Sequence, residues 1–526
     1  MNRRILAVVA LIGAATAMGA GSIVLARQSL IDRIERELSQ RGARWDATRH
    51  DWATLQWSSV STDMAQAEHI TIHLLDRGIS VGPVTIGPQP PHEAPPRTAP
   101  NAAAPTQPSP SGGLWALFAP TTLTMDSIDV PLGDALPIAD ALRIHQPKRE
   151  AWSITRGENN EWAIAGSGLE IAAADHTASD AVVRVVASSP PTIEATIPKF
   201  RVDHPALSTD PLPAQELSII ATIDRRDGNA EGTIRYGGVS ARFTAARSNG
   251  GIRATAELPA TPLADVADVF GAAIPEREAM TLSGTVGVSA AIEGPPWSWT
   301  AQPSVNAIAA SGGVPASLRD DQLQFTRGER SHVIGPSIDG WVSLSDAGWF
   351  AEAAIAAEDI RFREHPGYDL VAIQEAIDAA PNEARIRGGS TITQQLVKNI
   401  FLDGRRTLRR KFRELLLSLA LEDRMSKDGI LQLYINVVEF GPNIRGIGQA
   451  ADAWFLKRPD QLTPREAAFL SAILPAPNAW HERIARTGTP PVVVVDRILD
   501  RMRRKGVLSA EQHRRARTTR LRLVPP

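Results

Sequence analysis

Two carboxylates, Glu358 and Glu414, flank a Gly-rich turn, a polar helix start and a group of cations. An apolar run precedes Glu358, and burial beside such residues raises the pKa of a carboxyl toward the range useful for proton transfer. Glu414 follows Arg410 by four residues, so both lie on one face of a helix. A plain ion pair between them is the alternative interpretation. A base next to cations suits transfer of a sugar from a phosphate-linked donor.

The cations are concentrated between Lys398 and Arg413, where seven Lys and Arg residues accompany one acid, Asp403. Cations in this arrangement can stabilise a phosphate as it leaves. A solvated basic helix is the alternative interpretation for Arg405, Arg409 and Arg413.

The Gly-rich turn leads into a polar helix that begins near Thr391. Thr391 and Gln394 have the spacing of a capping box, so part of this segment is expected to serve helix architecture. Gln394 and Lys398 lie four residues apart and share a helical face. The amides of Gln394, Gln395 and Asn399 are candidates for hydrogen bonds to sugar or phosphate.

Five motifs resemble, in order and spacing, those of the family 51 peptidoglycan glycosyltransferases, which polymerise lipid II. They occupy residues 358–367, 387–399, 410–414, 427–441 and 445–455. The resemblance covers roughly Trp341 to Trp480, little more than a quarter of the chain. Two departures are mild: Trp454 stands where the family usually has Tyr, and Arg363 where a second aromatic is common.

The resemblance implies a helical, lysozyme-like fold and a reaction that joins a sugar hydroxyl to the anomeric carbon of a growing lipid-linked chain. The implied reaction inverts the configuration of the anomeric carbon and releases a polyprenyl diphosphate. Glu358 matches the catalytic base and Glu414 the second essential carboxylate. The residues implied at the substrate are Asp359, His365, Ser390, Thr391, Thr393, Gln394, Gln395, Lys398, Asn399, Arg406, Arg410, Asn436 and Arg445.

Within this set, Lys398 and Arg406 match positions that bind the diphosphate, and Arg410 belongs to an Arg-Lys-x-x-Glu motif. Asn436 and Arg445 are candidate residues of the site wall in motifs that are mostly structural. The leaving group is already a lipid diphosphate, so no cofactor is expected to be required. A divalent cation, Mg or Mn, could assist the diphosphate, although no convincing ligand spacing is present.

The implied partners are lipid II, the nascent glycan strand and the inner membrane, with cell wall synthesis proteins as further candidates through the β-rich region. Nucleic acid is not expected, because no zinc spacing or helix-turn-helix signature accompanies the basic residues. No Ser-x-x-Lys or Lys-Thr-Gly element occurs, so a monofunctional enzyme without transpeptidase activity is expected.

Two other functions remain open on the same residues. A lysozyme-like glycan-cleaving enzyme also uses a pair of carboxylates, but hydrolysis has no diphosphate leaving group for the cations to bind. A non-catalytic envelope scaffold would only bind lipid or partner proteins, and the presence of both carboxylates with the cations argues against it. Lipid II turnover and the release of soluble muropeptides from sacculi distinguish the three.

The chain has 526 residues, too many for one ordinary core, and no cysteine, which excludes a disulfide framework. Its net charge of −2 is uneven: residues 346–526 hold 29 Lys and Arg against 22 Asp and Glu, and the remainder holds 27 against 36. A basic C-terminal part suits an anionic partner such as a phosphate-bearing lipid, and a solvated basic surface is the usual alternative.

An apolar run over residues 5–26 follows Arg3 and Arg4. At ~1.5 Å per residue it reaches ~33 Å, enough to cross the hydrocarbon core of a bilayer. We expect an uncleaved signal anchor, which predicts a single-pass protein of the bacterial inner membrane with a periplasmic catalytic domain. Cleavage as a signal peptide near residues 15–17 is the alternative.

The predicted fold class is multidomain α+β, with an N-terminal transmembrane helix, a β-rich middle and an all-α, lysozyme-like C-terminal domain. The expected parts are an anchor (1–27), a helix plus strands (28–87), a Pro-rich linker (88–113), a β-rich envelope domain (114–345), the glycosyltransferase domain (346–490) and a basic helical tail (491–526). Residues 282–288 and the helix before them faintly resemble envelope β-proteins of the AsmA-like kind. The β-rich domain is expected to be dispensable for the chemical step, so that a chain beginning near Gln322 stays active.

Local patterns predict individual elements in both regions. Alternating runs predict strands at 57–61, 69–75, 181–187, 217–223, 232–236 and 282–292, and a short helix at 263–270. Helices are expected to begin after Ser426 and after Thr463. A tail helix over 492–505 is expected to turn Ile498, Leu499 and Met502 inward and to turn its cations outward, namely Arg501, Arg503, Arg504 and Lys505.

Overall fold

The computed structural model describes Glu35, Leu38, Ser39 and most of the chain from residue 43 to residue 524. The larger stretches outside the described residues are 87–121, 132–140, 146–151, 157–161 and 380–388, and shorter ones include 203–206 and the single residue Arg406. The expected anchor and Pro-rich linker lie outside the described residues. Within the described part, no helix is long and apolar enough to cross a membrane.

The chain divides into two compact units that each combine distant stretches of sequence. The first holds residues 1–202, 214–259 and 288–300, and the second holds 203–213, 260–287 and 301–526. Three long strands contribute residues to both units: β17 (Gly251–Pro262), β18 (Met280–Gly294) and β19 (Ser298–Gly312).

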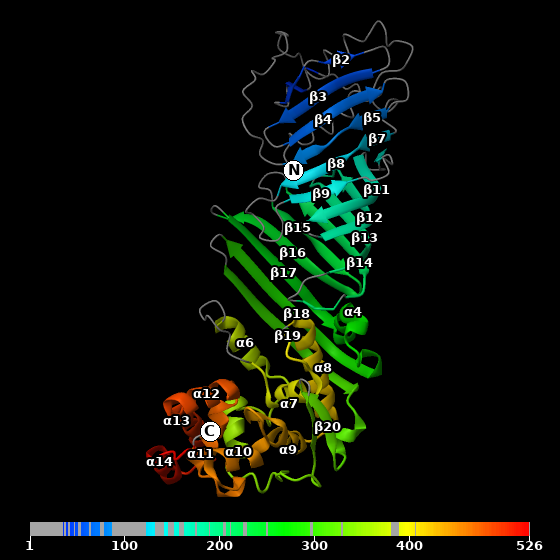
Figure 1. The fold of residues 1–526 in the computed structure, drawn as a ribbon. Helices are drawn as coiled ribbons and strands as arrows, with labels where there is room; N and C mark the ends of the chain where they lie inside the picture. Colours follow the sequence, from blue (N-terminus) through cyan, green and yellow to red (C-terminus); the bar gives the residue numbers. More distant parts are fainter. Residues whose placement is uncertain are drawn as a thin grey trace. The chain divides into compact units, whose positions relative to one another are not determined.

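The first unit is built mainly from antiparallel strand pairs, and from β11 to β17 each strand pairs with the next along the chain (Figure 1). Two parallel pairs, β5 with β7 and β6 with β8, occur nearer the N-terminus. The other strands are β1 (Arg44–Trp45), β2 (Arg49–His50), β3 (Thr54–Thr62), β4 (Ala65–His73), β5 (Gly78–Val81), β6 (Val84–Ile86), β7 (Thr122–Met125), β8 (Ser127–Pro131), β9 (Ala141–His145), β10 (Ser153–Arg156), β11 (Trp162–Ala173), β12 (His176–Val186), β13 (Thr192–Phe200), β14 (Gln215–Ile223), β15 (Ala230–Tyr236) and β16 (Val239–Ser248).

Alternation along these strands separates a charged face from an apolar one. On the charged face, ion pairs cross from strand to strand, as between Arg184 and Glu194 (3.1 Å). On the other face, alternate positions of β14 carry apolar side chains, such as Leu217 and Ile219. The β-rich middle expected from the sequence is confirmed, and the strand predicted at 217–223 lies inside β14.

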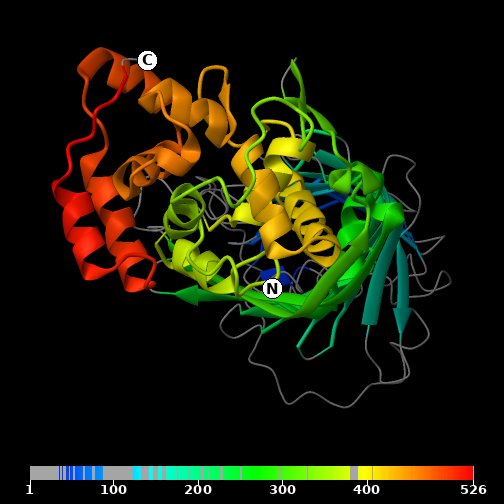
Figure 2. The same cartoon turned by 90° about the horizontal axis from the view of Figure 1, so that it is seen from below.

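The second unit is mainly helical, and Figure 2 shows its yellow-to-red helices grouped together. The helices are α4 (Leu263–Phe270), α5 (Phe350–Glu358), α6 (Leu370–Ala379), α7 (Ile392–Phe401), α8 (Leu408–Arg424), α9 (Lys427–Val437), α10 (Gly446–Phe455), α11 (Pro464–Ile473), α12 (Pro477–Thr487), α13 (Val492–Arg504) and α14 (Ala510–Thr518). Short 3₁₀ turns are η3 (Gly271–Ala273), η4 (Arg277–Ala279), η5 (Ala316–Arg319) and η7 (Pro459–Gln461). Two hairpins accompany them, β20 (Leu323–Arg327) with β21 (Arg330–Ile334) and β22 (Glu439–Gly441) with β23 (Ile444–Arg445).

Several helices begin at a capping Ser or Thr that the sequence indicates. Thr391 and Thr463 each form a complete capping box, and Ser426 accepts a hydrogen bond from the backbone N–H of Gly429. These contacts satisfy N–H groups that have no partner in the first helical turn. The predicted starts of α7, α9 and α11 are confirmed, as is the short helix α4.

The core of the second unit is centred on large aromatic side chains that are almost fully buried, including Phe350, Phe362 and Tyr434. Leu212, Phe270 and Ile274 belong to the same hydrophobic cluster, although they precede the five motifs by many residues. Chain outside the motif region therefore helps to form the core on which the motifs are built.

Helix α13 buries Ile498, Leu499 and Met502 as the sequence predicts. The expectation that Arg501 points outward is wrong. Its Nη1 donates to the backbone carbonyls of Ala356 and Ala357, each at 3.1 Å. The last carbonyls of a helix have no partner within the helix, and Arg501 satisfies two of them at the end of α5.

Candidate active site

Glu358 is the last residue of α5, and its carboxylate is held by a short chain of polar groups from two other helices. Gln395 of α7 donates from Nε2 to Oε2 of Glu358 at 2.7 Å. The hydroxyl of Tyr434, on α9, donates to Oε1 of Gln395 at 3.2 Å. Because Tyr434 supplies a donor to the amide oxygen, the amide nitrogen of Gln395 must face Glu358.

Burial raises the pKa of Glu358 above its ordinary value. The hydrogen bond from Gln395 and the positive charges of Lys398 and Arg501 act in the opposite direction, and the neighbouring Asp359 adds to the rise. The net direction is the one that the apolar run before Glu358 suggests. A carboxylate in these surroundings accepts a proton more readily than an exposed one.

Glu414 lies on α8 and is 2 % exposed, yet two cations contact its carboxylate. Arg410 lies at 3.1 Å from Oε2, one helical turn earlier, and Lys411 lies at 2.6 Å from Oε1. The expected pairing of Arg410 with Glu414 is confirmed. Lys411 also donates to Ser390 Oγ at 2.8 Å and to Gln394 Oε1 at 3.3 Å, which ties α8 to the start of α7.

Lys411 was not predicted as a site residue, although it stands inside the Arg410–Glu414 segment. On a helix, residues three apart share a face as well as residues four apart, so the spacing of Lys411 and Glu414 was a usable signal. The side chain of Lys411 is 44 % exposed, whereas that of Glu414 is almost inaccessible. Lys411 therefore contacts Glu414 and is also accessible from solvent.

Lys398 of α7 lies in the field of both carboxylates. Burial lowers its pKa, and the charges of Glu414 and Glu358 raise it in return, while Arg327 and Arg410 lower it further. Arg327, on β20, donates to the backbone carbonyls of Lys398 (3.2 Å) and Leu402 (2.8 Å) at the C-terminal end of α7. Lys398 is thus within electrostatic range of both carboxylates. Its helix is held at the C-terminal end by the hairpin β20–β21.

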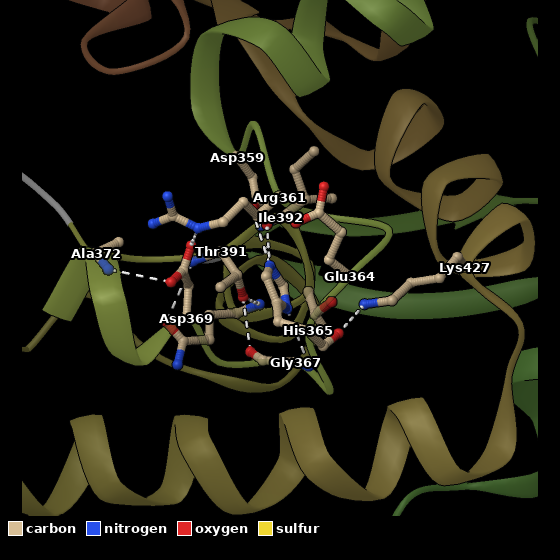
Figure 3. A network of polar contacts seen from close by, with 12 residues as sticks. Asp359, Arg361, Glu364, His365, Gly367, Asp369, Ala372, Thr391, Ile392 and Lys427 are labelled. Atoms are coloured by element: carbon tan, nitrogen blue, oxygen red, sulfur yellow. Dashed lines mark hydrogen bonds and ion pairs between the residues drawn. The ribbon is translucent and has the colours of Figure 1, made fainter. Parts of the chain in front are cut away.

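Asp359 and His365 form a network that supports the site (Figure 3). His365 Nε2 lies 2.9 Å from Asp359 Oδ1, and Asp359 Oδ2 accepts from the backbone N–H of Ile392 at 3.0 Å. The ring nitrogen Nδ1 of His365 accepts from the N–H of Gly367 at 3.2 Å, so Nε2 is the protonated nitrogen that donates to Asp359. Gly367 has φ = 91°, a conformation that favours glycine.

This network fixes the start of α7 relative to the end of α5. The Thr391 hydroxyl donates to the carbonyl of Gly367 at 2.8 Å, and Lys427 donates to the carbonyl of His365 at 2.6 Å. Asp359, His365 and Thr391 were expected at the substrate. The structure places them in contacts that join the end of α5 to the start of α7 (Figure 3). Glu358 and Gln395, which contact each other directly, lie on these same two helices.

Asp369 completes a group of three potential metal ligands with Asp359 and His365, whose ligand atoms lie within 4.8 Å of one another. Arg361 donates to Asp369 Oδ2 at 2.7 Å, and the N–H of Ala372 donates to Oδ1 at 3.1 Å. Since Asp359 also accepts two N–H groups, both carboxylates already have protein donors. The hydrogen bonds account for this cluster without a metal ion.

Most of the other predicted site residues make hydrogen bonds within the protein. Asn436 is 4 % exposed and exchanges two hydrogen bonds of 2.9 Å with the backbone of Val342. Arg445 donates to the carbonyl of Val437 at 2.7 Å. Thr393 donates to Glu422 at 2.5 Å, and Asn399 donates to the carbonyl of Gln395 at 2.9 Å. Arg406 lies outside the described residues.

The described residues thus define a helical domain in which two carboxylates lie beside a cluster of Lys and Arg side chains. Residues 337–503 match the family model described as Transglycosylase. This match confirms the resemblance drawn from the motifs and identifies a transglycosylase-family domain within the chain.

Curated relatives cover the same part of the chain. Proteins named biosynthetic peptidoglycan transglycosylase are 44 % identical over 138 residues in Cronobacter sakazakii and 47 % identical over 140 residues in Salmonella heidelberg and Salmonella enteritidis. Each alignment covers 26 % of this chain and 57 % of the relative. The chain therefore spans slightly more than half the length of the relatives it matches.

Proposed function

We propose that the protein is a peptidoglycan glycosyltransferase that polymerises lipid II into glycan strands and releases a polyprenyl diphosphate. The observation that carries this proposal is the pair of carboxylates in contrasting surroundings, with Lys398 in the field of both. The names of the relatives and the transglycosylase family model support it. We further propose that the enzyme is monofunctional.

In the proposed mechanism, Glu358 is the general base. Gln395 donates a hydrogen bond to Oε2 of Glu358. The other oxygen, Oε1, is therefore the atom that takes the proton from the acceptor hydroxyl. The oxygen of that hydroxyl forms a bond to the anomeric carbon of the donor, while the bond from that carbon to the diphosphate oxygen breaks. A raised pKa makes Glu358 a better proton acceptor than an ordinary carboxylate.

The leaving diphosphate is stabilised by cations in this proposal. Lys398, Arg410 and Lys411 are the described candidates, and Arg406 is a further one outside the described residues. Glu414 keeps Arg410 and Lys411 in place and compensates their charge until the diphosphate arrives. Preorganised cations of this kind act where negative charge develops in the transition state.

The substrate proposed here is a membrane lipid, so we also propose that the protein works at the bacterial inner membrane with its catalytic domain in the periplasm. The leaving group is the lipid diphosphate itself, so the proposed reaction requires no cofactor, and Mg or Mn could assist the diphosphate. Adding EDTA to the assay, and then restoring each cation, tests this part of the proposal.

Polymerisation of lipid II by the full-length protein is the decisive assay. We expect glycan strands from the wild type and a loss of about 10³-fold or more from Glu358→Gln, because a positioned general base contributes roughly 10²–10⁴-fold. Glu352→Gln is the matched control, since Glu352 lies on the same helix and pairs with Arg363 instead (3.6 Å). Wild-type activity in Glu358→Gln would refute the role of Glu358.

Incubation with intact sacculi separates this function from glycan cleavage. We expect no soluble muropeptides, because the cations have no role in hydrolysis of a glycosidic bond. Release of muropeptides together with no turnover of lipid II would establish the lysozyme-like function in place of the one proposed.

A further inference from the structure

Helix α8 carries a second set of side chains on the side opposite Glu414. At 3.6 residues per turn, positions 410, 411 and 414 share one side of the helix and positions 409, 412 and 413 share the other. The side chains of Arg409 and Arg413 are 15 % and 24 % exposed. The alternative interpretation of a solvated basic helix is therefore wrong for these two arginines, whereas the side chain of Arg405 is 52 % exposed.

The partners of this opposite side come from two stretches that precede the transglycosylase match, residues 207–213 and residues 263–279. We call these two stretches the α8 clamp. The carbonyl of Leu207 accepts the backbone N–H of Arg409 at 2.9 Å, which satisfies a group left without a partner in the first turn of α8. The side chain of Arg409 donates to the carbonyl of Ala273 at 2.7 Å and pairs with Asp210.

Further along α8, the clamp contributes a charged and an aromatic contact. Glu276 binds Arg413 with both carboxylate oxygens, and the contact from Nε to Oε2 measures 2.8 Å. Phe270 stacks on Phe412 with ring centroids 5.2 Å apart and an interplanar angle of 27°. A bidentate Arg–carboxylate pair and a stacked pair of rings together restrict both the rotation of α8 and its translation along its axis.

We propose that the α8 clamp sets the position of Arg410, Lys411 and Glu414, and that Asp210, Phe270 and Glu276 are positioning residues for the transfer. The inference rests on the proposed function. A helix is stiff, so a rotation permitted on one side moves the side chains on the other side by a similar angle. Misplacement of reacting groups by about 1 Å can cost about 10²-fold in rate.

The clamp changes what is expected of a shortened chain. The family match begins at residue 337, so both stretches of the α8 clamp lie outside the matched region. A protein that begins near Gln322 would lack Leu207, Asp210, Phe270 and Glu276, and Arg413 would lose its carboxylate partner. We therefore expect that residues 207–213 and 263–279 contribute to the chemical step. This differs from the expectation, drawn from the sequence, that the residues before 322 are dispensable.

A charge exchange in the full-length protein tests the inference. We expect Glu276→Arg and Arg413→Glu each to lower kcat about tenfold with KM changed by less than about twofold, a loss of transition-state positioning rather than of substrate binding. The double variant should recover kcat to within about threefold of the wild type, because the pair is rebuilt in reverse. The matched exchange of Arg184 and Glu194, an exposed pair at 3.1 Å, should leave kcat unchanged.

Amide hydrogen exchange over residues 408–414 and the thermal unfolding midpoint accompany the kinetics. Both single variants should exchange faster in this segment, and the double variant should not. If either charge-reversal variant fails to fold, Glu276→Gln and Arg413→Lys replace them, with a smaller loss of kcat expected. An active wild type with unchanged kcat in every folded variant, or a double variant without recovery, would overturn the clamp alone. A wild type that does not polymerise lipid II would instead overturn the proposed function, and the clamp inference with it.

Discussion

The end of α5 and the face of α8 each present a carboxylate, but the surroundings of the two groups are opposite. Glu358 receives one neutral amide donor at 2.7 Å, and burial raises its pKa. Glu414 is contacted by an arginine at 3.1 Å and a lysine at 2.6 Å. The difference agrees with the proposed division of roles, in which one glutamate exchanges a proton and the other organises positive charge.

The largest effect that would sharpen this comparison is on stability. We expect Glu414→Gln to lower the free energy of unfolding by about 3 kcal/mol, because it leaves Arg410 and Lys411 without their counter-charge. Glu358→Gln should not lower it, since the glutamine keeps an oxygen for Gln395 and removes a buried charge. Denaturant unfolding of both variants measures the difference, and equal losses would show that the two surroundings are energetically alike.

The pH dependence gives the second test. Between the ordinary pKa of a glutamate and the raised pKa of Glu358, the folded protein holds a proton that the unfolded chain has lost. Stability of the wild type relative to Glu358→Gln therefore falls as the pH rises through this window. The two unfolding midpoints should coincide at low pH, with the variant higher at pH 8.

The same shift affects catalysis in the opposite sense. The base must be ionised, so kcat/KM should rise with pH through the pKa of Glu358 and reach its plateau above the range of an ordinary glutamate. The neighbours that set this value are Gln395, Lys398, Arg501 and Asp359. If the acid limb of the kcat/KM profile has its midpoint at the ordinary pKa of an exposed glutamate, Glu358 is not the base.

Local features of the site could be predicted from the sequence because they depend on neighbours along the chain. The capping box at Thr391 and the pairing of Arg410 with Glu414 follow from spacings of three and four residues. The motifs also identified Glu358, whose pKa is raised by burial in the direction expected.

Contacts between distant stretches could not be predicted in the same way. A run of cations does not reveal that Arg413 binds Glu276, which lies 137 residues earlier. Asp359 looked like a substrate ligand, and only the fold brings it to the N–H of Ile392 at the start of α7. Arg501 looked like a surface cation for the same reason, because nothing in its own helix indicates the carbonyls at the end of α5.

A smaller effect concerns the lysine that sequence reasoning missed. We expect Lys411→Met to lower kcat about tenfold, because the variant keeps the apolar stem and removes one cation from Glu414 and from the proposed diphosphate site. Lys505→Met is a matched control: Lys505 pairs with Glu364 at 3.2 Å, and its side chain is also 44 % exposed. Equal activity of the two variants in lipid II polymerisation would remove Lys411 from the site.

The smallest expected effect tests how the amide beside Glu358 is oriented. Tyr434 is fully buried, and its hydroxyl fixes Oε1 of Gln395 at 3.2 Å, so that Nε2 faces the carboxylate. In Tyr434→Phe the amide can turn its oxygen toward Glu358, which removes the hydrogen bond that lowers the pKa of that carboxyl. We expect kcat/KM to fall about threefold at neutral pH, its acid limb to move to higher pH, and stability to fall by about 1 kcal/mol.

Tyr236→Phe is the control variant, because it removes a tyrosine hydroxyl far from Glu358 in the sequence. That hydroxyl lies 3.4 Å from the carbonyl of Phe200 in the β-rich unit. An unchanged acid limb in Tyr434→Phe would mean that the amide keeps its orientation without the tyrosine, and that the contrast between the two carboxylates does not depend on this hydroxyl.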